Sequence, residues 1–376
     1  MSDLPDEAWI IAMAGLPKVG PSRLRALLGL GTPGEVWQSI RSGRVPVELI
    51  SGSARSSASS IVAAWSSSAK QIDPAAVWQA HVEAGIGVAV RGSASFPGCL
   101  DSDDDPPTII FWKGDIDHLA GTRVAIVGTR RATRYGIDVA NELARELSLA
   151  GVSVVSGLAL GIDGAAHSGA IAVDGAPPIA VVGSGLDRVY PREHRSLWRC
   201  VTERGVILSE HPLGTPAVAW QFPARNRIIA ALADVVVVVE SQSTGGALGT
   251  AIEGARRSRP VLAVPGPVTA PSSAGTNQLL FDGCAPARDV ADVLLALGRE
   301  PSARRSSGER RPLPSGGAAV VLEALPWQST AIERIVIDTG LGLGDVMLAL
   351  DVLEADGWVV HRSGRVERVA RAASNR

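Results

Sequence analysis

The sequence predicts an α/β protein built around a mostly parallel sheet that helices cover on both faces. Apolar, β-branched runs at 124–127 and 152–155 are joined by a stretch with helical periodicity. Two strands connected by a helix need a crossover and are therefore parallel. The run at 235–239 is valine throughout, so both of its faces must be buried. These observations predict a Rossmann-like sheet.

We assign this sheet domain to residues 71–298. Each expected strand ends in a loop rich in glycine, proline or charged residues, as strand–loop–helix units require. The expected strands are 124–127, 152–155, 179–182, 206–208, 234–239 and 261–264, preceded by two short strands at 88–90 and 108–112. The acidic run at 101–105 is interpreted as a solvated turn.

Residues 1–70 are expected to form a separate domain of short helices. The segment 10–28 resembles a helix-hairpin-helix, a motif whose glycine-rich turn offers backbone N–H groups to a DNA phosphate. Lys18 stands where the first hairpin glycine is usual. The alternative, a small bundle used for packing or dimerisation, is favoured here.

The C-terminal part is expected to be a linker at 299–317 followed by a module at 318–370. The linker is rich in Arg, Ser, Pro and Gly. The module shows three helical segments and then a hairpin, which is the order of a winged helix. Its third helix carries four acidic residues around 345–356 and no basic one, and carboxylates repel DNA phosphates. We therefore favour a protein contact over DNA reading for this module.

Composition limits the function classes. The net charge is −2, so a nucleic-acid site must be a local patch. The three cysteines are far apart and form no CxxC pair, which indicates neither a disulfide framework nor a zinc site. No apolar run of about eighteen residues and no basic leader is present, so we expect a cytoplasmic protein without a membrane contact.

The loop after the strand at 124–127 is the first candidate site. It reads Gly128-Thr129-Arg130-Arg131 and continues to Arg134 at the start of a helix. Ligands of open α/β sheets bind at the carboxyl ends of the strands. Glycine lets backbone N–H groups approach an anion, a helix N-terminus favours negative charge, and arginine pairs with phosphate. The pattern indicates a phosphate site. The alternative is a tight turn with solvated arginines.

Three aromatic residues extend this site. Tyr135, Tyr190 and Phe222 lie in strand-end loops, each beside arginines and a glycine or proline. If the strands are parallel, these loops gather at one edge of the sheet. Arginines that follow a backbone, combined with aromatic faces for bases, are typical of a groove for a single nucleic-acid strand. The alternative is that the tyrosines anchor loops to the core.

Enzymatic readings are weaker. No G-x-G-x-x-G follows the first strand, and no G-x-x-x-x-G-K-[ST] loop occurs, so no NAD or ATP requirement is expected. The run Gly245 to Glu253 resembles, with one extra residue, the Gly-Gly-x-Gly-Thr-x-x-Glu motif of Rossmann-like nucleoside monophosphate phosphoribohydrolases, whose Glu helps to cleave a glycosidic bond. That chemistry would need a second placed acid or base. The alternative, a glycine-rich phosphate turn that opens a helix carrying Glu253, is favoured here. We expect no catalytic residue, no cofactor and no metal, with such an enzyme as the alternative. His167 and His211 are interpreted as structural.

The ordered motifs also resemble the DNA-processing protein A (DprA, also called Smf) family. They are Val-Gly-Thr-Arg at 127–130, Tyr135-Gly136, Ser-Gly-Leu-Ala-Leu-Gly-Ile-Asp at 156–163, Ala-Ala-His at 165–167, Asn-Arg-Ile-Ile-Ala-Ala at 226–231 and Ala-Val-Pro-Gly at 263–266. The resemblance implies an N-terminal domain similar to sterile-alpha-motif folds, an extended Rossmann-like domain and a winged-helix-like C-terminal module. It further implies a homodimer that binds and protects single-stranded DNA and loads the RecA recombinase during natural transformation.

The resemblance also implies site residues. The loop at 128–130 and Arg192, where lysine is frequent, would hold DNA phosphates. This chain departs from the family pattern at 244–250, at His194 in place of asparagine and at Cys284 in place of alanine. The complete set of predicted DNA-binding residues, all in strand-end loops, is Gly128, Thr129, Arg130, Arg131, Arg134, Tyr135, Gly157, Gly185, Tyr190, Arg192, Phe222, Arg225, Asn226, Arg227, Gly245 and Gly246.

Overall fold

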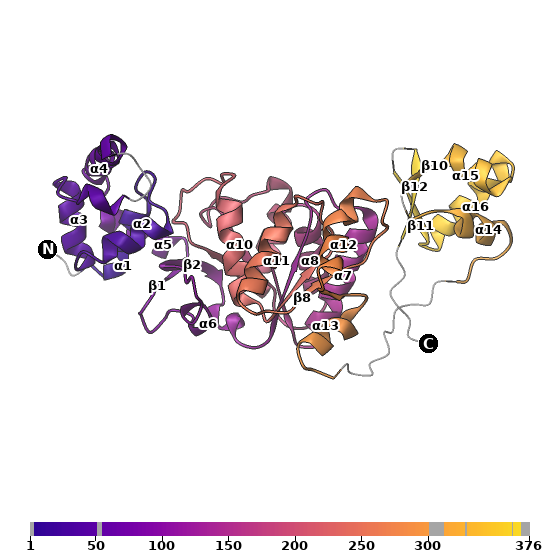
Figure 1. Cartoon of the computed structure of the whole chain (residues 1–376), viewed down its shortest axis with the longest axis horizontal. Coiled ribbons are helices and arrows are strands. Elements are labelled where there is room, and N and C mark those ends of the chain that lie inside the picture. The colour runs from indigo at the N-terminus through magenta and orange to yellow at the C-terminus, as the bar shows by residue number, and fades with distance from the viewer. Residues whose placement is uncertain (1–3, 51–54, 301–311, 328, 363, 370–376) are drawn as a thin grey trace.

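The computed structural model describes residues 4–50, 55–300, 312–327, 329–362 and 364–369 of the chain. Figure 1 shows three parts in chain order: an N-terminal helical region, a central sheet between helices, and a small C-terminal module with its own sheet. The predicted α/β class with a mostly parallel sheet is confirmed. Much of the predicted linker, residues 301–311, lies outside the described residues. Within the described ranges, no helix is long and apolar enough to cross a membrane.

The N-terminal region is helical and closes around two buried tryptophans. Trp37 and Trp65 are almost fully buried, and the Trp65 Nε1–H donates to the Pro17 carbonyl at 2.8 Å. The last of its helices lies beyond the predicted boundary at residue 70 and packs against the first. The turn at Lys18 adopts φ +60°, the left-handed region that glycine would favour. The helices are α1 (Asp6–Ala14), α2 (Pro21–Leu28), α3 (Pro33–Arg41), η1 (Val47–Leu49), α4 (Arg55–Ala69) and α5 (Pro74–Glu83).

The central sheet has nine strands in the order β1-β2-β6-β5-β4-β3-β7-β8-β9. All neighbours from β6 to β9 are parallel, and β1 and β2 continue the sheet antiparallel beyond β6. The two early strands and the six main ones were predicted, whereas the two-residue β9 was not. The strands are β1 (Gly87–Val90), β2 (Ile109–Gly114), β3 (Arg123–Val127), β4 (Ser153–Ser156), β5 (Ile179–Val182), β6 (Val206–Ser209), β7 (Val235–Val238), β8 (Val261–Ala263) and β9 (Ala285–Pro286).

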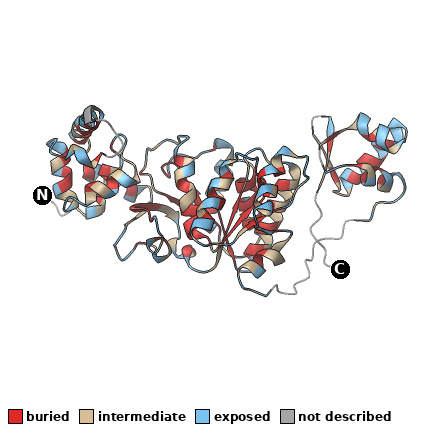
Figure 2. Cartoon of the chain, viewed as in Figure 1, coloured by how far each residue is buried: buried red, intermediate tan, exposed pale blue. Residues whose placement is uncertain are grey.

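Alternation along the strands explains the two helical layers. In β3, Val124 and Ile126 join one apolar cluster, and Ala125 and Val127 join the cluster on the other face. The first face is covered by α7 (Arg134–Leu149), α8 (Ile162–Ile171) and α13 (Val290–Ala296), and the second by α10 (Gln221–Leu232) and α11 (Gly246–Arg256). Strand β7 is buried on both faces, as its unbroken valines predict. Figure 2 shows this buried layer through the centre of the molecule.

The remaining helices complete the central part. Helix α9 (Arg195–Arg204) packs its Trp198 and Val201 beside strands β5 and β6. The shorter ones are α6 (Gly98–Asp101), η2 (Ile116–Leu119), η3 (Arg192–His194), η4 (Pro271–Ser273) and α12 (Ala274–Phe281).

The acidic run at 101–105 is not a simple solvated turn, so that interpretation was wrong. The Asp103 carboxylate is buried and receives two hydrogen bonds from Arg257, at 2.6 and 2.9 Å. Asp105 lies between Arg25 of helix α2, at 3.3 Å, and Arg227 of helix α10, at 3.4 Å. The run therefore joins the N-terminal helices to the sheet domain through ion pairs.

The C-terminal module has the predicted order of three helices followed by a hairpin. Its small antiparallel sheet has the order β10-β12-β11, and the two-residue β10 was not predicted. A separate apolar core, which includes Val321, Leu350 and Val366, lies between helices and sheet. The elements are α14 (Gly316–Ala324), β10 (Thr330–Ala331), α15 (Ile332–Thr339), α16 (Leu343–Ala355), β11 (Val359–Arg362) and β12 (Arg365–Arg368).

Candidate nucleic-acid interface

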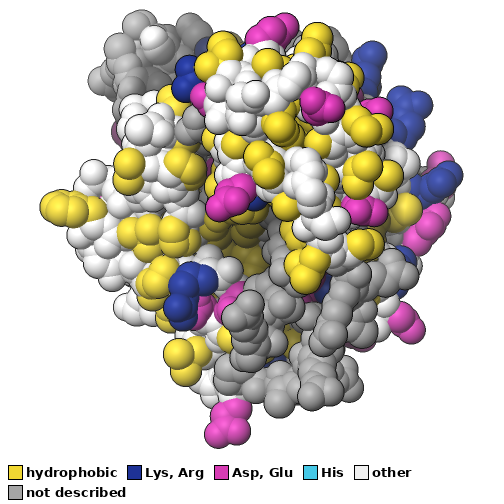
Figure 3. All heavy atoms as spheres, turned by 90° about the vertical axis from the view of Figure 1, so that its right-hand side faces the viewer, with side chains coloured by type: hydrophobic (Ala, Val, Ile, Leu, Met, Phe, Trp, Pro, Cys, Tyr) yellow, Lys and Arg dark blue, Asp and Glu magenta, His cyan; other side chains and the backbone are white. Residues whose placement is uncertain are grey.

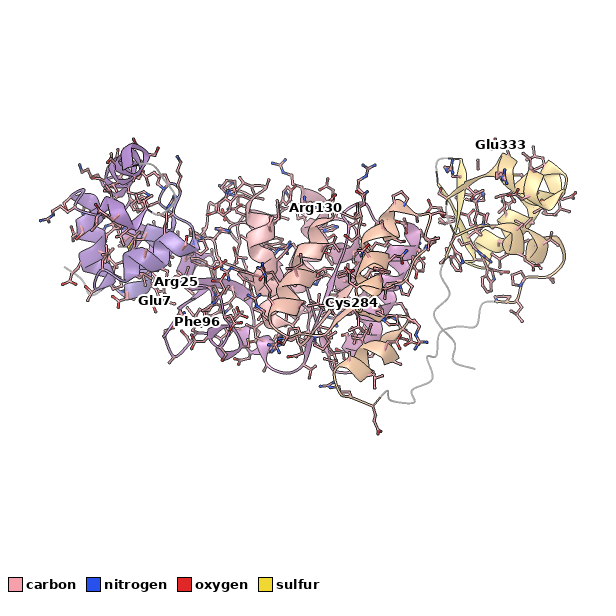
Figure 4. The ribbon with its side chains drawn as sticks, in the orientation of Figure 1. Glu7, Arg25, Phe96, Arg130, Cys284 and Glu333 are labelled. Carbon is pink, nitrogen blue, oxygen red and sulfur yellow. The ribbon has the colours of Figure 1, made fainter. Side chains whose placement is uncertain are left out.

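The candidate site lies along the carboxyl edge of the parallel strands. Strands β6, β5, β4 and β3 are consecutive in the sheet, so the loops that follow them meet at one edge. Neighbouring strands are about 4.8 Å apart, so this part of the edge is roughly 14 Å long. It carries the loops of Arg130, Tyr190 and His211. Figure 4 marks Arg130 at this edge.

Three of the predicted residues form one compact group, which we call the Arg130 cluster: Arg130, Phe222 and Tyr190. The Arg130 guanidinium carbon lies 4.5 Å from the centre of the Phe222 ring. The Tyr190 ring is 5.5 Å from the Phe222 ring at an angle of 36°. Tyr190 and Arg130 are exposed, so a ligand can reach both. The predicted combination of an arginine with aromatic rings is therefore present in the folded chain, with Arg130 and Tyr190 in two loops and Phe222 in the first turn of α10.

Two further arginines are exposed beside this cluster. Arg131 follows Arg130 in the same loop, and Arg192 begins the short helix η3 just after Tyr190. A guanidinium at an open edge can pair with a phosphate through two parallel hydrogen bonds. Arg130, Arg131 and Arg192 are thus exposed cations of this edge.

The glycine loops behind these arginines are already occupied by a carboxylate of the chain itself. Asp163 is buried at the start of α8, and its Oδ2 accepts the Gly157 N–H at 3.2 Å. The backbone N–H groups of Gly128 and Ala159 also donate to this carboxylate. Burial raises the pKa of Asp163, while nearby Arg225 and the three donors act in the opposite direction. The nest, meaning the backbone N–H groups of Gly128, Gly157 and Ala159 at the expected phosphate site, therefore holds the Asp163 carboxylate.

Arg225 belongs to this buried group, so its predicted contact with DNA gives way to a structural role. It is only 6% exposed, and its guanidinium donates to the Val181 carbonyl and lies close to Asp163. A Cβ at Gly157 would stand 1.7 Å from the Arg225 Nη1. Gly157 therefore leaves room for the buried guanidinium, and neither residue faces the open edge.

A second carboxylate anchors the loop that carries Arg130. Glu240, at the end of β7, accepts the Thr133 N–H at 2.9 Å and the Thr133 hydroxyl at 2.5 Å. Its backbone carbonyl accepts the Thr129 N–H at 2.8 Å. Burial raises the pKa of Glu240, and the hydrogen bonds from Thr133 oppose this shift. The backbone N–H groups of Gly128 and Thr129 are thus used inside the fold, and the loop presents its arginine side chains instead.

Arg134 and Tyr135 are largely committed to contacts within the chain. Arg134 pairs with Asp138 at 2.8 Å, one helical turn along α7. The half-buried Tyr135 donates its hydroxyl to the Pro265 carbonyl at 3.0 Å. Tyr135 therefore anchors a loop, which is the alternative stated for one tyrosine. Its ring also meets Trp327 of the C-terminal module edge-on, with ring centres 6.3 Å apart.

The predicted residues of the 226–246 region lie around the start of helices α10 and α11. Arg227 is tied to Glu210 at 2.5 Å and to the Asp105 carbonyl at 2.8 Å, with a side chain 12% exposed, so it joins elements instead of facing solvent. The Asn226 amide donates to the Gly246 carbonyl at 3.2 Å. Gly245 caps α11, and Gly246 has open space around it.

Gly185 is also structural. A Cβ there would stand 2.5 Å from the Pro212 carbonyl oxygen, so the position needs glycine for the close approach of two strand-end loops.

The prediction omitted one aromatic residue at this edge, Trp220. It is 57% exposed and immediately precedes α10. Its ring meets His211, which follows β6, edge-on at 6.1 Å. Burial lowers the pKa of His211 to about 4, so the imidazole is neutral at pH 7. The signal was present in the sequence, because Trp220 stands two positions before Phe222 in the same segment.

Glu253 and His167, two residues considered for catalysis, are engaged or buried within the chain. Glu253 lies seven residues into α11, about 10 Å from its N-terminus by helix geometry. Its carboxylate is held by Arg257 at 2.6 Å and Arg256 at 2.8 Å. His167 is fully buried, and burial lowers its pKa to about 3. The described ranges contain no group of three or more His, Cys, Asp or Glu side chains that could hold a metal ion.

Sequence comparisons with known proteins agree on one family. A family model for DNA recombination-mediator protein A matches residues 87–298. The DNA processing protein DprA of Bacillus subtilis is 38% identical over 222 residues, which are 59% of this chain and 74% of that protein. The crystal structure of DNA processing protein A from Streptococcus pneumoniae is 28% identical, covers 78% of this chain and 98% of its own, and has a TM-score of 0.63.

A second solved structure adds a ligand. DNA processing protein A from Helicobacter pylori is 30% identical, with a TM-score of 0.51, and the alignment covers 56% of this chain and 95% of that one. That protein binds single-stranded DNA.

Proposed function

Because this chain belongs to the DNA recombination-mediator protein A family, we propose that it binds single-stranded DNA along the carboxyl edge of its parallel strands. The observation that carries the proposal is the Arg130 cluster, where a guanidinium lies over an aromatic ring and a second ring is exposed beside it. Arginines neutralise phosphates, and aromatic faces stack on unpaired bases of any sequence. Single-stranded DNA binding by the Helicobacter pylori relative supports the same assignment.

The mechanism of binding follows from which side chains are exposed to a ligand and which are bound within the fold. The buried carboxylates of Asp163 and Glu240 take up the loop N–H groups, so they fix the loop without touching the ligand. Arg130, Arg131 and Arg192 are exposed and contact phosphates. Phe222 and Tyr190 contact bases. This division predicts binding that falls with salt yet depends little on sequence, because phosphate contacts and stacking on aromatic faces do not distinguish the bases.

We also propose that the protein is not an enzyme and needs no cofactor. A phosphoribohydrolase would require a free acid near the bound nucleotide, whereas Glu253 is paired with two arginines far from the edge. The nest that would hold a nucleotide phosphate is filled by Asp163. The family relationship supports the remaining roles proposed here: protection of the strand, loading of the RecA recombinase onto it, and action as a homodimer in the cytoplasm.

The flanking parts have separate roles in this proposal. We infer that the N-terminal helices form a sterile-alpha-motif-like domain and that the C-terminal module is winged-helix-like. The exposed face of α16 carries Leu348 and Val352 beside Asp345 and Asp351. Figure 3, which faces this module, shows many apolar side chains with acidic ones between them, and basic side chains toward its margins. Such a face repels phosphate and suits a protein contact.

Two assays on the full chain test the proposal. Fluorescence anisotropy with a labelled single-stranded oligonucleotide should show saturable binding that is stronger than binding to the matching duplex. A base-release assay with nucleoside monophosphates should show no activity above a blank. Base release without DNA binding would replace the proposal by the phosphoribohydrolase alternative. Micromolar NAD or ATP binding that competes with DNA would contradict the absence of a nucleotide site.

A further inference from the structure

Trp220 is an exposed aromatic residue that the contacts described so far leave without a role. More than half of its surface is accessible, and its ring contact with another aromatic side chain is the edge-on contact with His211. A single exposed apolar residue is common on protein surfaces and alone indicates nothing. The position of Trp220 relative to the Arg130 cluster is what distinguishes it.

The sheet order places Trp220 in line with that cluster. His211 follows β6, Tyr190 follows the neighbouring β5, and Arg130 follows β3 two strands further on. The His211 contact therefore holds Trp220 at the β6 end of the same edge. From β6 to β3 the edge measures roughly 14 Å, or about four base spacings at 3.4 Å each. Aromatic rings thus occur along the edge at a spacing that successive unpaired bases can use.

The chemistry around Trp220 suits a base and not a phosphate or a carboxylate partner. The indole has a large π face with a single N–H donor, and the adjacent His211 imidazole is neutral at pH 7 because burial lowers its pKa to about 4. Glu210, the residue before His211, is buried and held by Arg227. The cations that would hold the strand, Arg192 and Arg130, lie further along the edge.

We propose that Trp220 is a base-stacking residue that extends the single-strand site toward β6, beyond the Arg130 cluster. This inference rests on the proposed function and deepens it, because it assigns one more subsite for an unpaired nucleobase. Stacking on an indole is not ionic, so the contribution of Trp220 should be independent of salt. It should also appear only with oligonucleotides long enough to reach from Arg130 to Trp220.

The test compares Trp220→Ala, Trp220→Phe and Arg130→Ala with the parent chain, using fluorescein-labelled oligothymidylates of increasing length. Trp327→Ala is the matched control, because Trp327 is a similarly exposed tryptophan on the C-terminal module. Trp220→Ala should weaken binding of long oligomers by roughly fivefold or more, with an unchanged salt slope, as a base–aromatic stack of about 1 kcal/mol or more requires. Trp220→Ala should bind the shortest oligomers as tightly as the parent does. Trp327→Ala should bind oligomers of every length as tightly as the parent does.

Intrinsic fluorescence gives a second measurement that does not need the alanine variant to fold. The difference between the emission of the parent and that of Trp220→Phe reports the tryptophan at position 220, and DNA should quench it. If Trp220→Ala binds every length like the parent while Arg130→Ala is weakened, the subsite is wrong and the proposed function stands. An unquenched difference spectrum would also refute the subsite. If neither variant is weakened, the proposed function itself fails.

Discussion

Stability should fall between pH 7 and pH 5 because His167 and His211 stay neutral in the folded chain. Burial lowers the pKa of His167 to about 3 and that of His211 to about 4, from a usual 6.5. In the unfolded chain both imidazoles take up a proton as the pH drops below 6.5, whereas in the folded chain they do not. Protonation therefore favours the unfolded chain, and the stabilisation present above pH 6.5 is lost as the pH falls toward 3 or 4.

The size of this effect follows from the linkage relation. At pH 5 the solution is about 1.5 pH units below the usual histidine pKa, so the unfolded imidazole is almost fully protonated. Each histidine that stays neutral in the folded chain therefore lowers the free energy of unfolding by about 2 kcal/mol relative to pH 7. Carboxylates with raised pKa, such as Glu240, act in the opposite sense, so the parent alone does not isolate the histidines. Comparing a variant with the parent at both pH values removes this contribution.

The assay is urea unfolding followed by tryptophan fluorescence at pH 7 and pH 5, for the parent, His167→Gln and His211→Gln. Each variant should lose about 2 kcal/mol less than the parent between the two pH values. A general change in stability caused by the substitution cancels in this difference. His118→Gln, the same substitution in the short helix η2, serves as the control. If both variants lose as much stability as the parent, the buried neutral histidines do not explain the pH dependence.

Three further predictions test other contacts. Arg257→Ala should lower the free energy of unfolding in urea by about 3–5 kcal/mol, because it leaves the buried Asp103 carboxylate unpaired. Its exposed neighbour is the control, and Arg256→Ala should cost less than about 1 kcal/mol. Equal costs for the two variants would contradict the buried pair. Gly157→Ala should cost at least roughly 2 kcal/mol, because its Cβ would overlap Arg225, whereas Gly246→Ala, in open space, should melt like the parent by circular dichroism. A chain that ends at Gly298 should keep single-strand binding in an anisotropy titration, because the C-terminal module has an acidic, apolar face; loss of binding by a folded truncation would assign DNA contacts to that module.

The parts of the fold that were predictable are those in which a local pattern decides the structure. Unbroken valines at 235–239 determine burial on both faces, and a strand followed by a glycine loop and a helix determines a parallel pair. The two-residue strands β9 and β10 carry no such pattern, since their pairing depends on a neighbour that is distant in sequence.

The same reasoning separates the predictable and unpredictable parts of the site. Arg130, Tyr190 and Phe222 could be grouped because parallel strands bring their loops to one edge. Arg225 and Arg227 read like exposed arginines in the sequence, yet their partners Asp163 and Glu210 decide that they are buried. Glu240 is 107 positions from Thr133, so its hold on the Arg130 loop could not be read from either segment.

The salt dependence of single-strand binding tests the central claim most directly. Arg130→Ala and Arg192→Ala should each weaken binding, the double variant more so, and each lost phosphate contact should reduce the slope of log affinity against log salt by about 0.7. Arg256→Ala, an exposed arginine near the end of α11, is the matched control and should keep the parent affinity and slope. All four variants should stay as stable as the parent, because exposed arginines contribute little stability. If the affinity and slope of both edge variants equal those of the parent, the carboxyl edge of this sheet does not hold the DNA backbone.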